Sequence, residues 1–323
     1  MKRLILILPL LLSLTGISKP KPESAVVDLS IFYSTDPGHD FKTLIIPIKR
    51  VQNLILIEAR LDSMVGNFIL DTGSPHLVLN KTYFRQGWKL YDKMAAHAGG
   101  VSTSPVMRTR VNNLAIKELF FEKLTADLSN LGHIENHRGI KILGLLGVSL
   151  FTDFEMVIDL HKDVMYLHKL DKNGLILAGE KLVKSQPIIK IPFKLIQNII
   201  TVEVLISGKK LTLCLDTGAE TNTLSNQLPD KVLESFTVSK RMVLLGTNGA
   251  RTEVLLGTIN EITVGTKSFK NMHAAITGLE DLGQAYGRSI DGMLGSSFLV
   301  KGIISINFAT KELCMYPFEV NEP

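Results

Sequence analysis

The sequence predicts an all-β protein built from two similar lobes in one chain. Short apolar, β-branched runs alternate with turn residues about every eight to twelve positions, which is typical of β structure. No amphipathic helix pattern longer than about three turns stands out. Residues of the first half also recur in the second half at a constant spacing, which indicates an internal duplication. The phrase Asp-Thr-Gly occurs once in each half, directly after an apolar run.

The composition is that of a folded globular protein. The 323 residues are enough for one large domain or for two lobes of ordinary size. A hydrophobic fraction of 45% and a charged fraction of 21% argue against disorder. The formal net charge is +5, and part of it lies at the extreme N-terminus. The remaining charge is too small to predict a nucleic-acid-binding surface.

The N-terminus has the pattern of an export signal. Lys2 and Arg3 precede a nearly unbroken apolar run, Leu4–Ile17, which is too short for a comfortable membrane span. Small residues at Gly16 and Ser18 offer a cleavage site. We therefore expect an exported protein, periplasmic, cell-surface or extracellular, with no stable membrane span after cleavage. A retained N-terminal anchor is the alternative.

The chain divides into five predicted parts. Asp171-Lys172-Asn173-Gly174 reads as a turn between the two lobes, so the linker is placed there. The parts are a signal peptide (1–18), an N-terminal lead segment (19–43), a first lobe (44–170), a linker (171–185) and a second lobe (186–323).

The first lobe begins with short predicted strands. Ile45–Ile48 and Leu54–Ile57 are apolar and β-branched, and residues 61–67 contain a hairpin turn. Phe68–Leu70 then leads into Asp71-Thr72-Gly73-Ser74. One Asp-Thr-Gly alone would be read as a turn between strands, so its significance depends on the second copy.

The second lobe repeats this arrangement. Asp216-Thr217-Gly218-Ala219 follows the first motif at an offset of 145, and so do several flanking residues. The equivalent pairs are Pro47 and Pro192, Gln52 and Gln197, Asn53 and Asn198, and Leu79 and Leu224. Farther on, Gly144–Leu150 aligns with Gly292–Phe298 at an offset of 148, so the second lobe carries three extra residues in between.

Two copies of one fold, related by a pseudo-two-fold axis, would bring Asp71 and Asp216 face to face. Two carboxylates that close cannot both ionise at modest cost, so the pair would hold one proton between them. Such a pair can activate a water as nucleophile and protonate a leaving amide nitrogen. These residue types in this pattern therefore point to peptide hydrolysis by the two aspartates.

The other motif residues would support the two loops. Thr72 and Thr217 can form hydrogen bonds across the axis, and Gly73 and Gly218 let the backbone turn tightly beside the carboxylates. Ser74 follows the first motif, whereas the second motif is followed by an alanine. Because only the serine can donate a hydrogen bond to a charged carboxylate, we expect the shared proton to prefer the second aspartate.

The sequence resembles the aspartic peptidases of the pepsin and retropepsin clan. Each lobe has the family's hydrophobic-hydrophobic-Asp-Thr-Gly and its later hydrophobic-hydrophobic-Gly, at Leu145-Leu146-Gly147 and Met293-Leu294-Gly295. The resemblance covers about residues 44–318 and is closest to single-chain tandem retropepsin-like proteins of bacteria. It implies a bilobal acid-protease fold with two similar β-barrel lobes and an interlobe cleft that binds substrate as an extended strand.

The resemblance also implies a glycine-rich flap over the cleft. In the first lobe the candidate lies between residues 96 and 101, and it lacks the tyrosine that pepsins carry there. The second lobe offers a similar segment, although both could be plain hairpin turns. The candidate flap residues are Ala98, Gly99, Gly100, Gly246, Thr247, Asn248 and Gly249. Glycine at these positions would let the backbone pair with a substrate strand.

Several remaining residues allow two interpretations. His133 and His137 have helical metal-ligand spacing, but no third ligand is evident nearby, so we expect a solvated loop, with no metal and no cofactor. His76 could reach the cleft, and a structural, partly buried histidine is the alternative that we favour. Cys214 and Cys314 could form a disulfide in an exported protein, or remain free.

The predicted function is therefore an aspartic endopeptidase that acts on peptides or unfolded proteins. The alternative is a non-catalytic module that binds peptides in the same cleft and cleaves nothing. The expected assembly is a monomer whose two lobes pair within the chain. Pairing of each lobe with a lobe of a second molecule remains the other possibility.

Overall fold

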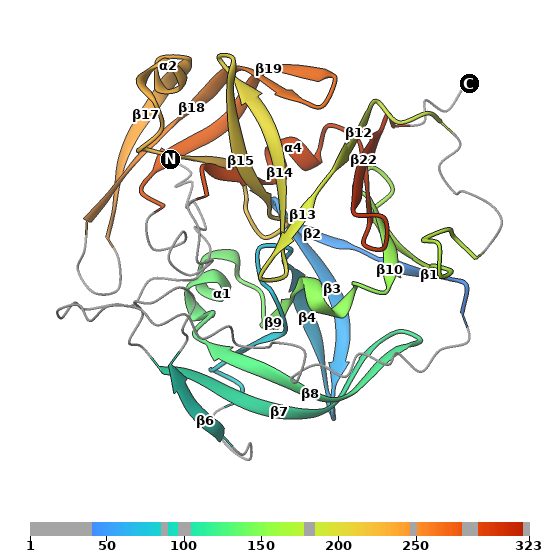
Figure 1. Ribbon diagram of the computed structural model, residues 1–323. Coiled ribbons are helices and arrows are strands. Elements are labelled where there is room, and N and C mark those ends of the chain that lie inside the picture. The colour runs from blue at the N-terminus through green and yellow to red at the C-terminus, as the bar shows by residue number, and fades with distance from the viewer. Residues whose placement is uncertain are drawn as a thin grey trace.

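The computed structural model confirms the all-β prediction, with three β-sheets and a few short helices (Figure 1). It describes residues 41–84, 90–95, 105–177, 185–245, 251–279 and 290–318. The predicted signal peptide, most of the lead segment and residues 178–184 of the predicted linker lie outside the described residues.

The first lobe contains an eight-stranded sheet with the order β2-β3-β4-β9-β5-β8-β7-β6. Strands β4 and β9 run parallel, as do β5 and β8, and the other neighbours are antiparallel. The strands are β2 (Lys49–Val51), β3 (Leu54–Leu61), β4 (Met64–Leu70), β5 (Val78–Asn80), β6 (Leu90–Ala95), β7 (Pro105–Ile116), β8 (Leu119–Ser129) and β9 (Ile142–Leu146).

The sheet of the second lobe has the same order strand for strand, β13-β14-β15-β20-β16-β19-β18-β17. Its parallel pairs, β15 with β20 and β16 with β19, are the third and fifth neighbouring pairs of the order, as β4 with β9 and β5 with β8 are in the first lobe. The strands are β13 (Lys194–Ile196), β14 (Ile199–Ile206), β15 (Lys209–Leu215), β16 (Asn222–Ser225), β17 (Phe236–Leu245), β18 (Arg251–Val264), β19 (Lys267–Thr277) and β20 (Gly292–Leu294).

A third, six-stranded sheet joins the lobes, in the order β1-β11-β10-β21-β22-β12. Three of its strands come from each lobe, and β10 meets β21 in an antiparallel pair that sets Glu155 opposite Asn307 and Val157 opposite Ser305. The strands are β1 (Thr43–Pro47), β10 (Phe154–Asp159), β11 (Val164–Lys169), β12 (Ile189–Pro192), β21 (Ile303–Asn307) and β22 (Glu312–Tyr316).

Several residues in the hairpin turns have a left-handed backbone, with φ between 50° and 74°. Gln52 and Gln197, at equivalent turns before β3 and β14, have φ of 56° and 50°. Asn198 also has a positive φ, which asparagine adopts more readily than most residues. The next pair of turns contains Asp62 and the Ser207-Gly208 step, so the two lobes bend the chain at corresponding places.

Short helices occupy the connections between strands. Helix α1 (Gly132–Arg138) lies between β8 and β9 and ends at Gly139, whose φ of 64° suits glycine. The others are η2 (Val148–Leu150), α2 (Asp230–Leu233) and α4 (Ser296–Leu299). Among the described residues no helix has the length and apolar character that a bilayer crossing requires.

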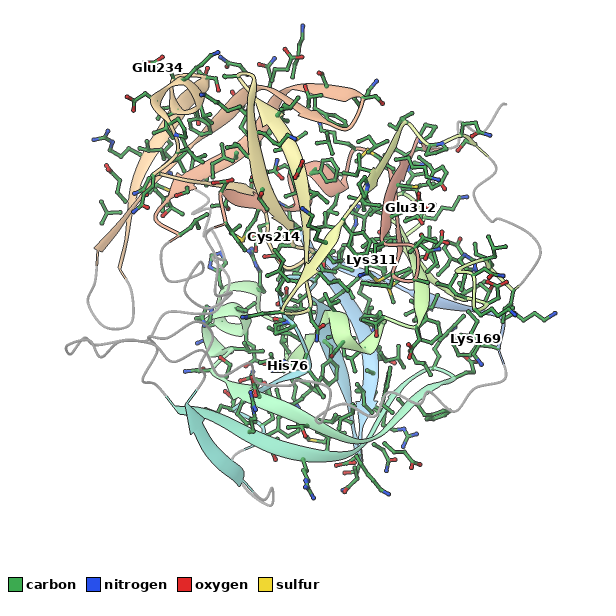
Figure 2. The ribbon with its side chains drawn as sticks, in the orientation of Figure 1. His76, Lys169, Cys214, Glu234, Lys311 and Glu312 are labelled. Carbon is green, nitrogen blue, oxygen red and sulfur yellow. The ribbon has the colours of Figure 1, made fainter. Side chains whose placement is uncertain are left out.

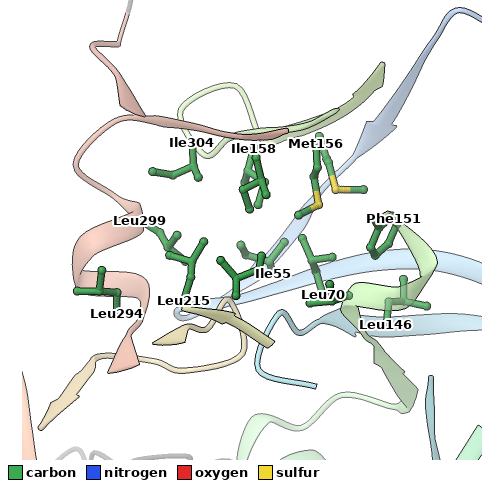
Figure 3. Packing of buried hydrophobic residues seen from close by; sticks show 14 of the residues in the cluster. Ile55, Leu70, Leu146, Phe151, Met156, Ile158, Leu215, Leu294, Leu299 and Ile304 are labelled. Atoms are coloured by element: carbon green, nitrogen blue, oxygen red, sulfur yellow. The ribbon is translucent and has the colours of Figure 1, made fainter. Parts of the chain in front are cut away.

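One hydrophobic core runs through both lobes. The last three residues of each strand that leads into a motif are buried, and Leu70 and Leu215 have no exposed surface. Figure 3 shows these two leucines below the six-stranded sheet, whose Ile158 and Ile304 point down toward them. Because apolar side chains at the ends of β4 and β15 are held in this shared core, the residues that follow them are fixed at the junction between the lobes.

Both cysteines are free thiols, which settles the interpretation that the sequence left open. Cys214 is buried on β15, two residues before the second motif aspartate, near the middle of the molecule (Figure 2). Burial raises the pKa of its thiol well above the usual value, and the nearby carboxyl group of Asp216 raises it further. Cys214 therefore packs as a small apolar group.

Candidate active site

The two motif aspartates lie at equivalent strand ends. Asp71 follows β4, and its backbone N–H donates to the carbonyl of Leu146 on β9, at 3.0 Å. Asp216 follows β15, and its N–H donates to the carbonyl of Leu294 on β20, at 2.9 Å. We call Asp71–Ser74 the first aspartate loop and Asp216–Ala219 the second aspartate loop. Each loop is thus anchored to the parallel strand beside it.

A reciprocal set of hydrogen bonds joins the loops across the lobes. The N–H of Thr72 donates to Oγ1 of Thr217, and the N–H of Thr217 donates to Oγ1 of Thr72, both at 3.0 Å. Each hydroxyl in turn donates to a carbonyl of the opposite lobe, that of Leu215 or Leu70, at 2.7 Å. Thr72 and Thr217 are almost completely buried, so these bonds are shielded from water.

The motif glycines let the two carboxyl groups approach each other. A Cβ added to Gly73 would lie 2.6 Å from Cγ of Asp216, and one added to Gly218 would lie 2.9 Å from Cγ of Asp71. Real Cβ atoms do not come that close to other heavy atoms, so neither position accepts a larger residue without a shift of the loop. Each glycine therefore faces the aspartate of the other lobe, and both aspartates lie in one place.

The two carboxyl groups receive different hydrogen bonds. Oδ1 of Asp71 accepts from the N–H of Gly73 at 2.9 Å, and Oδ1 of Asp216 accepts from the N–H of Gly218 at 2.8 Å. Only Asp71 has a hydroxyl partner: Oγ of Ser74 donates to its Oδ2 at 2.7 Å. The corresponding residue of the second loop is an alanine, so the asymmetry expected from the sequence is present as a hydrogen bond.

The pKa values of both aspartates lie above the ordinary value. Burial raises the pKa of Asp71, and the hydrogen bond from Ser74 is the largest of the contacts that oppose this rise. Burial also raises the pKa of Asp216 well above its usual range, reinforced by the charge of Asp71 and by a hydrogen bond between the two carboxyl groups. Burial and the neighbouring charge therefore favour a protonated carboxyl group in the pair, and they favour it more at Asp216 than at Asp71.

The glycines of the two hydrophobic-hydrophobic-Gly segments pack against the chain that follows each aspartate motif. A Cβ on Gly147 would lie 2.3 Å from the carbonyl oxygen of His76, and one on Gly295 would lie 2.4 Å from that of Thr221. The residue after each glycine also binds the loop: the N–H of Val148 donates to the carbonyl of Ser74 at 3.0 Å, and the N–H of Ser296 donates to that of Ala219 at 2.9 Å. These contacts place the hydrophobic-hydrophobic-Gly segments directly against the residues after the motifs.

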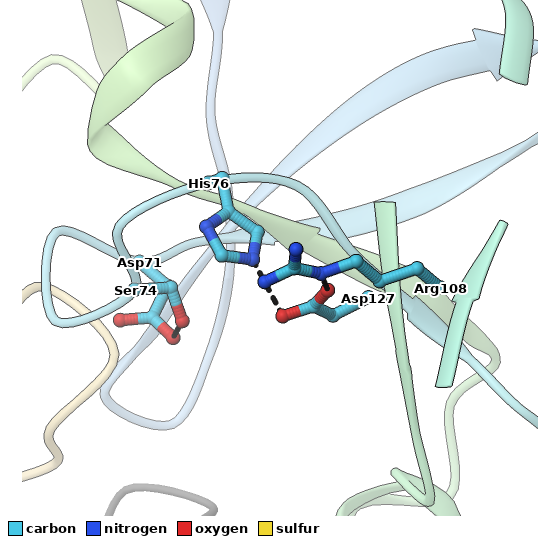
Figure 4. A network of polar contacts seen from close by, with 5 residues as sticks. All are labelled: Asp71, Ser74, His76, Arg108 and Asp127. Atoms are coloured by element: carbon cyan, nitrogen blue, oxygen red, sulfur yellow. Dashed lines mark hydrogen bonds and ion pairs between the residues drawn. The ribbon is translucent and has the colours of Figure 1, made fainter. Parts of the chain in front are cut away.

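His76 belongs to a polar network beside the first aspartate loop (Figure 4). Its Nε2 lies 2.6 Å from Oδ2 of Asp127 on β8, and Nε of Arg108 on β7 donates to Oδ1 of the same carboxylate at 2.9 Å. Burial alone would raise the pKa of Asp127, but the hydrogen bonds and charges of His76 and then Arg108 lower it. Through Asp127 on β8, His76 therefore holds the segment after the first motif against the sheet of its own lobe.

Sequence reasoning did not find four charged residues near the loops. Asp127 and Arg108 are far from His76 in sequence, and no spacing connects them. Glu220, which follows the second aspartate loop, forms a buried ion pair with Arg138 at the end of α1 in the first lobe. The sequence signal for Glu220 was its position next to the motif, but nothing in the sequence marks Arg138 as its partner.

The candidate flap residues lie outside the described residues, so their predicted role stays a prediction. What is described is the pair of hairpins that flank them. Strands β6 and β7 are antiparallel, with Ala95 opposite Pro105, and β17 and β18 are antiparallel, with Leu245 opposite Arg251. In the sequence, each candidate flap therefore falls between the two strands of an antiparallel pair, and the two pairs are equivalent in the sheet order.

The histidines with metal-ligand spacing lie on α1. His133 is exposed, and His137 is in the last turn. Across the part of the chain that the structure describes, no three histidine, cysteine, aspartate or glutamate side chains gather in a way that could hold a metal ion.

The two lobes share one sheet order, and each supplies an Asp-Thr-Gly loop to a shared centre, an arrangement of the aspartic-peptidase type. Residues 202–298, most of the second lobe, match the family model described as aspartyl protease. Over these residues the chain is thus similar to aspartyl proteases, as its motifs predict.

Comparisons with other known proteins add the following. Among solved structures, the chain is similar to one titled "Crystal structure of edgp", with a TM-score of 0.49 and 9% identity over 85% of this chain and 95% of that chain. It is also similar to basic 7S globulin from soybean, with a TM-score of 0.46 and 10% identity over 85% of this chain and 94% of that chain. No curated protein matches the sequence.

Proposed function

We propose that the protein is an aspartic endopeptidase whose catalytic residues are Asp71 and Asp216. The observation that carries the proposal is the contact of each motif glycine with the aspartate of the other lobe, which puts two carboxyl groups with raised pKa values in one place. The match of residues 202–298 to the aspartyl protease family model supports peptidase chemistry.

The proposed reaction uses the two aspartates in different roles. Asp71, whose charge is stabilised by the Ser74 hydroxyl, accepts a proton from a water molecule held between the carboxyl groups. The water attacks the carbonyl carbon of the scissile peptide bond, while the proton on Asp216 stabilises the carbonyl oxygen as it gains charge. A proton then passes to the leaving nitrogen, the C–N bond breaks, and one proton remains on the pair.

The substrate in this proposal is a peptide or an unfolded protein bound as an extended strand. The hairpins β6–β7 and β17–β18 supply strand edges with which such a chain can pair. Folded substrates are excluded by this binding mode, because an extended segment must be free to enter between the hairpins.

Purified protein and unfolded protein substrates test the proposal across a pH series. We expect cleavage that pepstatin inhibits, and loss of cleavage in Asp71→Asn and in Asp216→Asn, with unchanged folding by circular dichroism. Glu234→Gln, an exposed acid on the second lobe, is the matched control and should retain full activity. A wild-type protein that binds peptides but cleaves none would instead identify a binding module and overturn the proposal.

We also propose that the protein works outside the cytoplasm. The basic and apolar pattern of the first 18 residues supports export, and it predicts a mature chain that begins near Lys19. N-terminal sequencing of the exported form checks this, and recovery of Met1 on a cytoplasmic protein would contradict it.

A further inference from the structure

The hydrogen bonds of Thr72 and Thr217 between the lobes do not by themselves determine which lobe pairs with which. Both loops read Asp-Thr-Gly, and the carbonyl acceptors belong to a leucine in each lobe. Two first lobes from different molecules could form the same bonds, and so could two second lobes. Something else at the junction must therefore distinguish pairing of unlike lobes from pairing of like lobes.

A buried ion pair provides one such distinction. Arg138, in the first lobe, contacts Glu220, in the second, and the two side chains are only 1% and 5% exposed. Asn53 of the first lobe also donates to the backbone carbonyl of Glu220 at 3.0 Å. At the offset of the internal repeat, the residue equivalent to Glu220 is Pro75. Two paired first lobes would therefore bury Arg138 against a proline, without a counter-charge.

The six-stranded sheet provides a second, independent distinction. Oε1 of Glu155 on β10 accepts from the hydroxyl of Ser305 at 2.6 Å, and its Oε2 accepts from Nδ2 of Asn307 at 3.0 Å, both on β21 of the other lobe. The first-lobe equivalent of Asn307 is Asp159. If β10 paired with a second β10 in this register, Glu155 would face Asp159, and like charges directly opposite are destabilising.

Pairing of two second lobes would also lose these contacts. The second-lobe equivalent of Glu155 is Ile303, at the start of β21. Ser305, which is 3% exposed, and Asn307 would then face an apolar side chain instead of a carboxylate acceptor. A buried hydroxyl without a partner is unfavourable, so this arrangement is disfavoured as well.

We propose that the Arg138–Glu220 ion pair and the contacts of Glu155 with Ser305 and Asn307 determine that a first lobe pairs with a second lobe and not with another first lobe. Removing one partner of a buried ion pair leaves an uncompensated charge, which is strongly destabilising. The partner recognised by each lobe is thus the unlike lobe.

The full-length protein tests this with charge reversal. Arg138→Glu and Glu220→Arg each place like charges in a buried site, and should lower the thermal midpoint by about 10 °C. They should also produce concentration-dependent dimers or larger species in analytical ultracentrifugation. The double variant Arg138→Glu/Glu220→Arg restores opposite charges and should return to a monomer with most of the lost midpoint recovered.

The matched control is the exposed ion pair of Lys49 and Glu58, which lies within the first lobe. Lys49→Glu should remain monomeric, with its midpoint within about 2 °C of wild type, because exposed pairs contribute little. Single reversals at Arg138 and Glu220 that behave like this control would overturn the proposal, and so would a double variant no better than the singles.

A milder pair of variants covers the case in which the reversals do not fold. Glu220→Gln leaves Arg138 charged and uncompensated, so its midpoint should fall, and adding Arg138→Met should recover it. Absence of that recovery would count against the ion pair. Mass and midpoint do not depend on peptide cleavage, so this inference and the proposed function can fail separately.

Discussion

The amide of Thr72 and the amide of Thr217 each donate a hydrogen bond to the hydroxyl of the other residue, at 3.0 Å. Both threonines are almost completely buried, and the hydroxyl of each donates a hydrogen bond to a backbone carbonyl of the opposite lobe. This arrangement links the position of one aspartate loop to that of the other, and it makes the junction between the lobes sensitive to small changes.

Thr72→Val should be strongly destabilising. Valine keeps the shape but leaves the carbonyl of Leu215 and the amide of Thr217 without partners, at about 1–3 kcal/mol each. We expect a loss of about 2–4 kcal/mol in the free energy of unfolding, measured by denaturant titration. Thr72→Ser keeps the hydroxyl and is the control; equal losses in both variants would show that the bonds are unimportant.

Gly73→Ala should disable the site with a smaller effect on the fold. Its Cβ would lie 2.6 Å from Cγ of Asp216, so the loop must move away from the other lobe. A displacement of that kind can reduce turnover by about 100-fold. Peptide cleavage rates check this, with Gly132→Ala, on the first turn of α1, as the control that should keep wild-type activity.

Ser74→Ala should shift the pH dependence of cleavage. The Ser74 hydroxyl stabilises the ionised form of Asp71, so its loss favours the doubly protonated, inactive pair. The acid limb of the pH–rate profile should therefore move to higher pH, by about one unit for a bond to a charged group. Ala219→Ser should instead move the alkaline limb to lower pH. An unchanged profile in both variants would refute the asymmetry.

Asp216→Asn should be more stable than wild type near neutral pH. The folded protein raises the pKa of Asp216, so it binds a proton that the unfolded chain releases above its ordinary value of 3.8. The stability due to this proton is complete below pH 3.8 and is lost as pH rises toward the folded pKa. Thermal midpoints should thus favour the variant at pH 7, and the difference should shrink toward pH 4; a constant difference would contradict this.

Asp127→Asn should show the opposite pH dependence. The folded protein lowers the pKa of Asp127 through His76 and Arg108, so the carboxylate stabilises the fold above its ordinary pKa and loses that effect as pH falls through the folded value. The variant should lose about 1.5–3 kcal/mol at pH 7, and the loss should shrink as the pH falls below the ordinary pKa of 3.8. Urea unfolding across this pH range measures the loss, and a loss that does not change with pH would exclude a charge effect.

The sequence determined the main features of the protein through local patterns. Short β-branched runs and turn residues predicted the all-β class, because alternation and turn chemistry act within a few residues. The Asp-Thr-Gly motif, repeated at one offset, predicted the two matching lobes and identified Asp71 and Asp216 as the candidate site residues. Even the difference between Ser74 and Ala219 was sufficient to predict which carboxyl group receives an extra hydrogen bond, because the donor is a near neighbour.

Only the tertiary structure decided the contacts between distant parts of the chain. Asp127 joins His76 because β8 runs parallel to β5, and Arg138 reaches Glu220 because α1 lies where the lobes meet. Neither pairing follows a sequence spacing, since each depends on how separate elements pack after the whole core has formed. The local sequence therefore specified the chemistry of each loop, while the packing of the two lobes fixed which charges face each other across them.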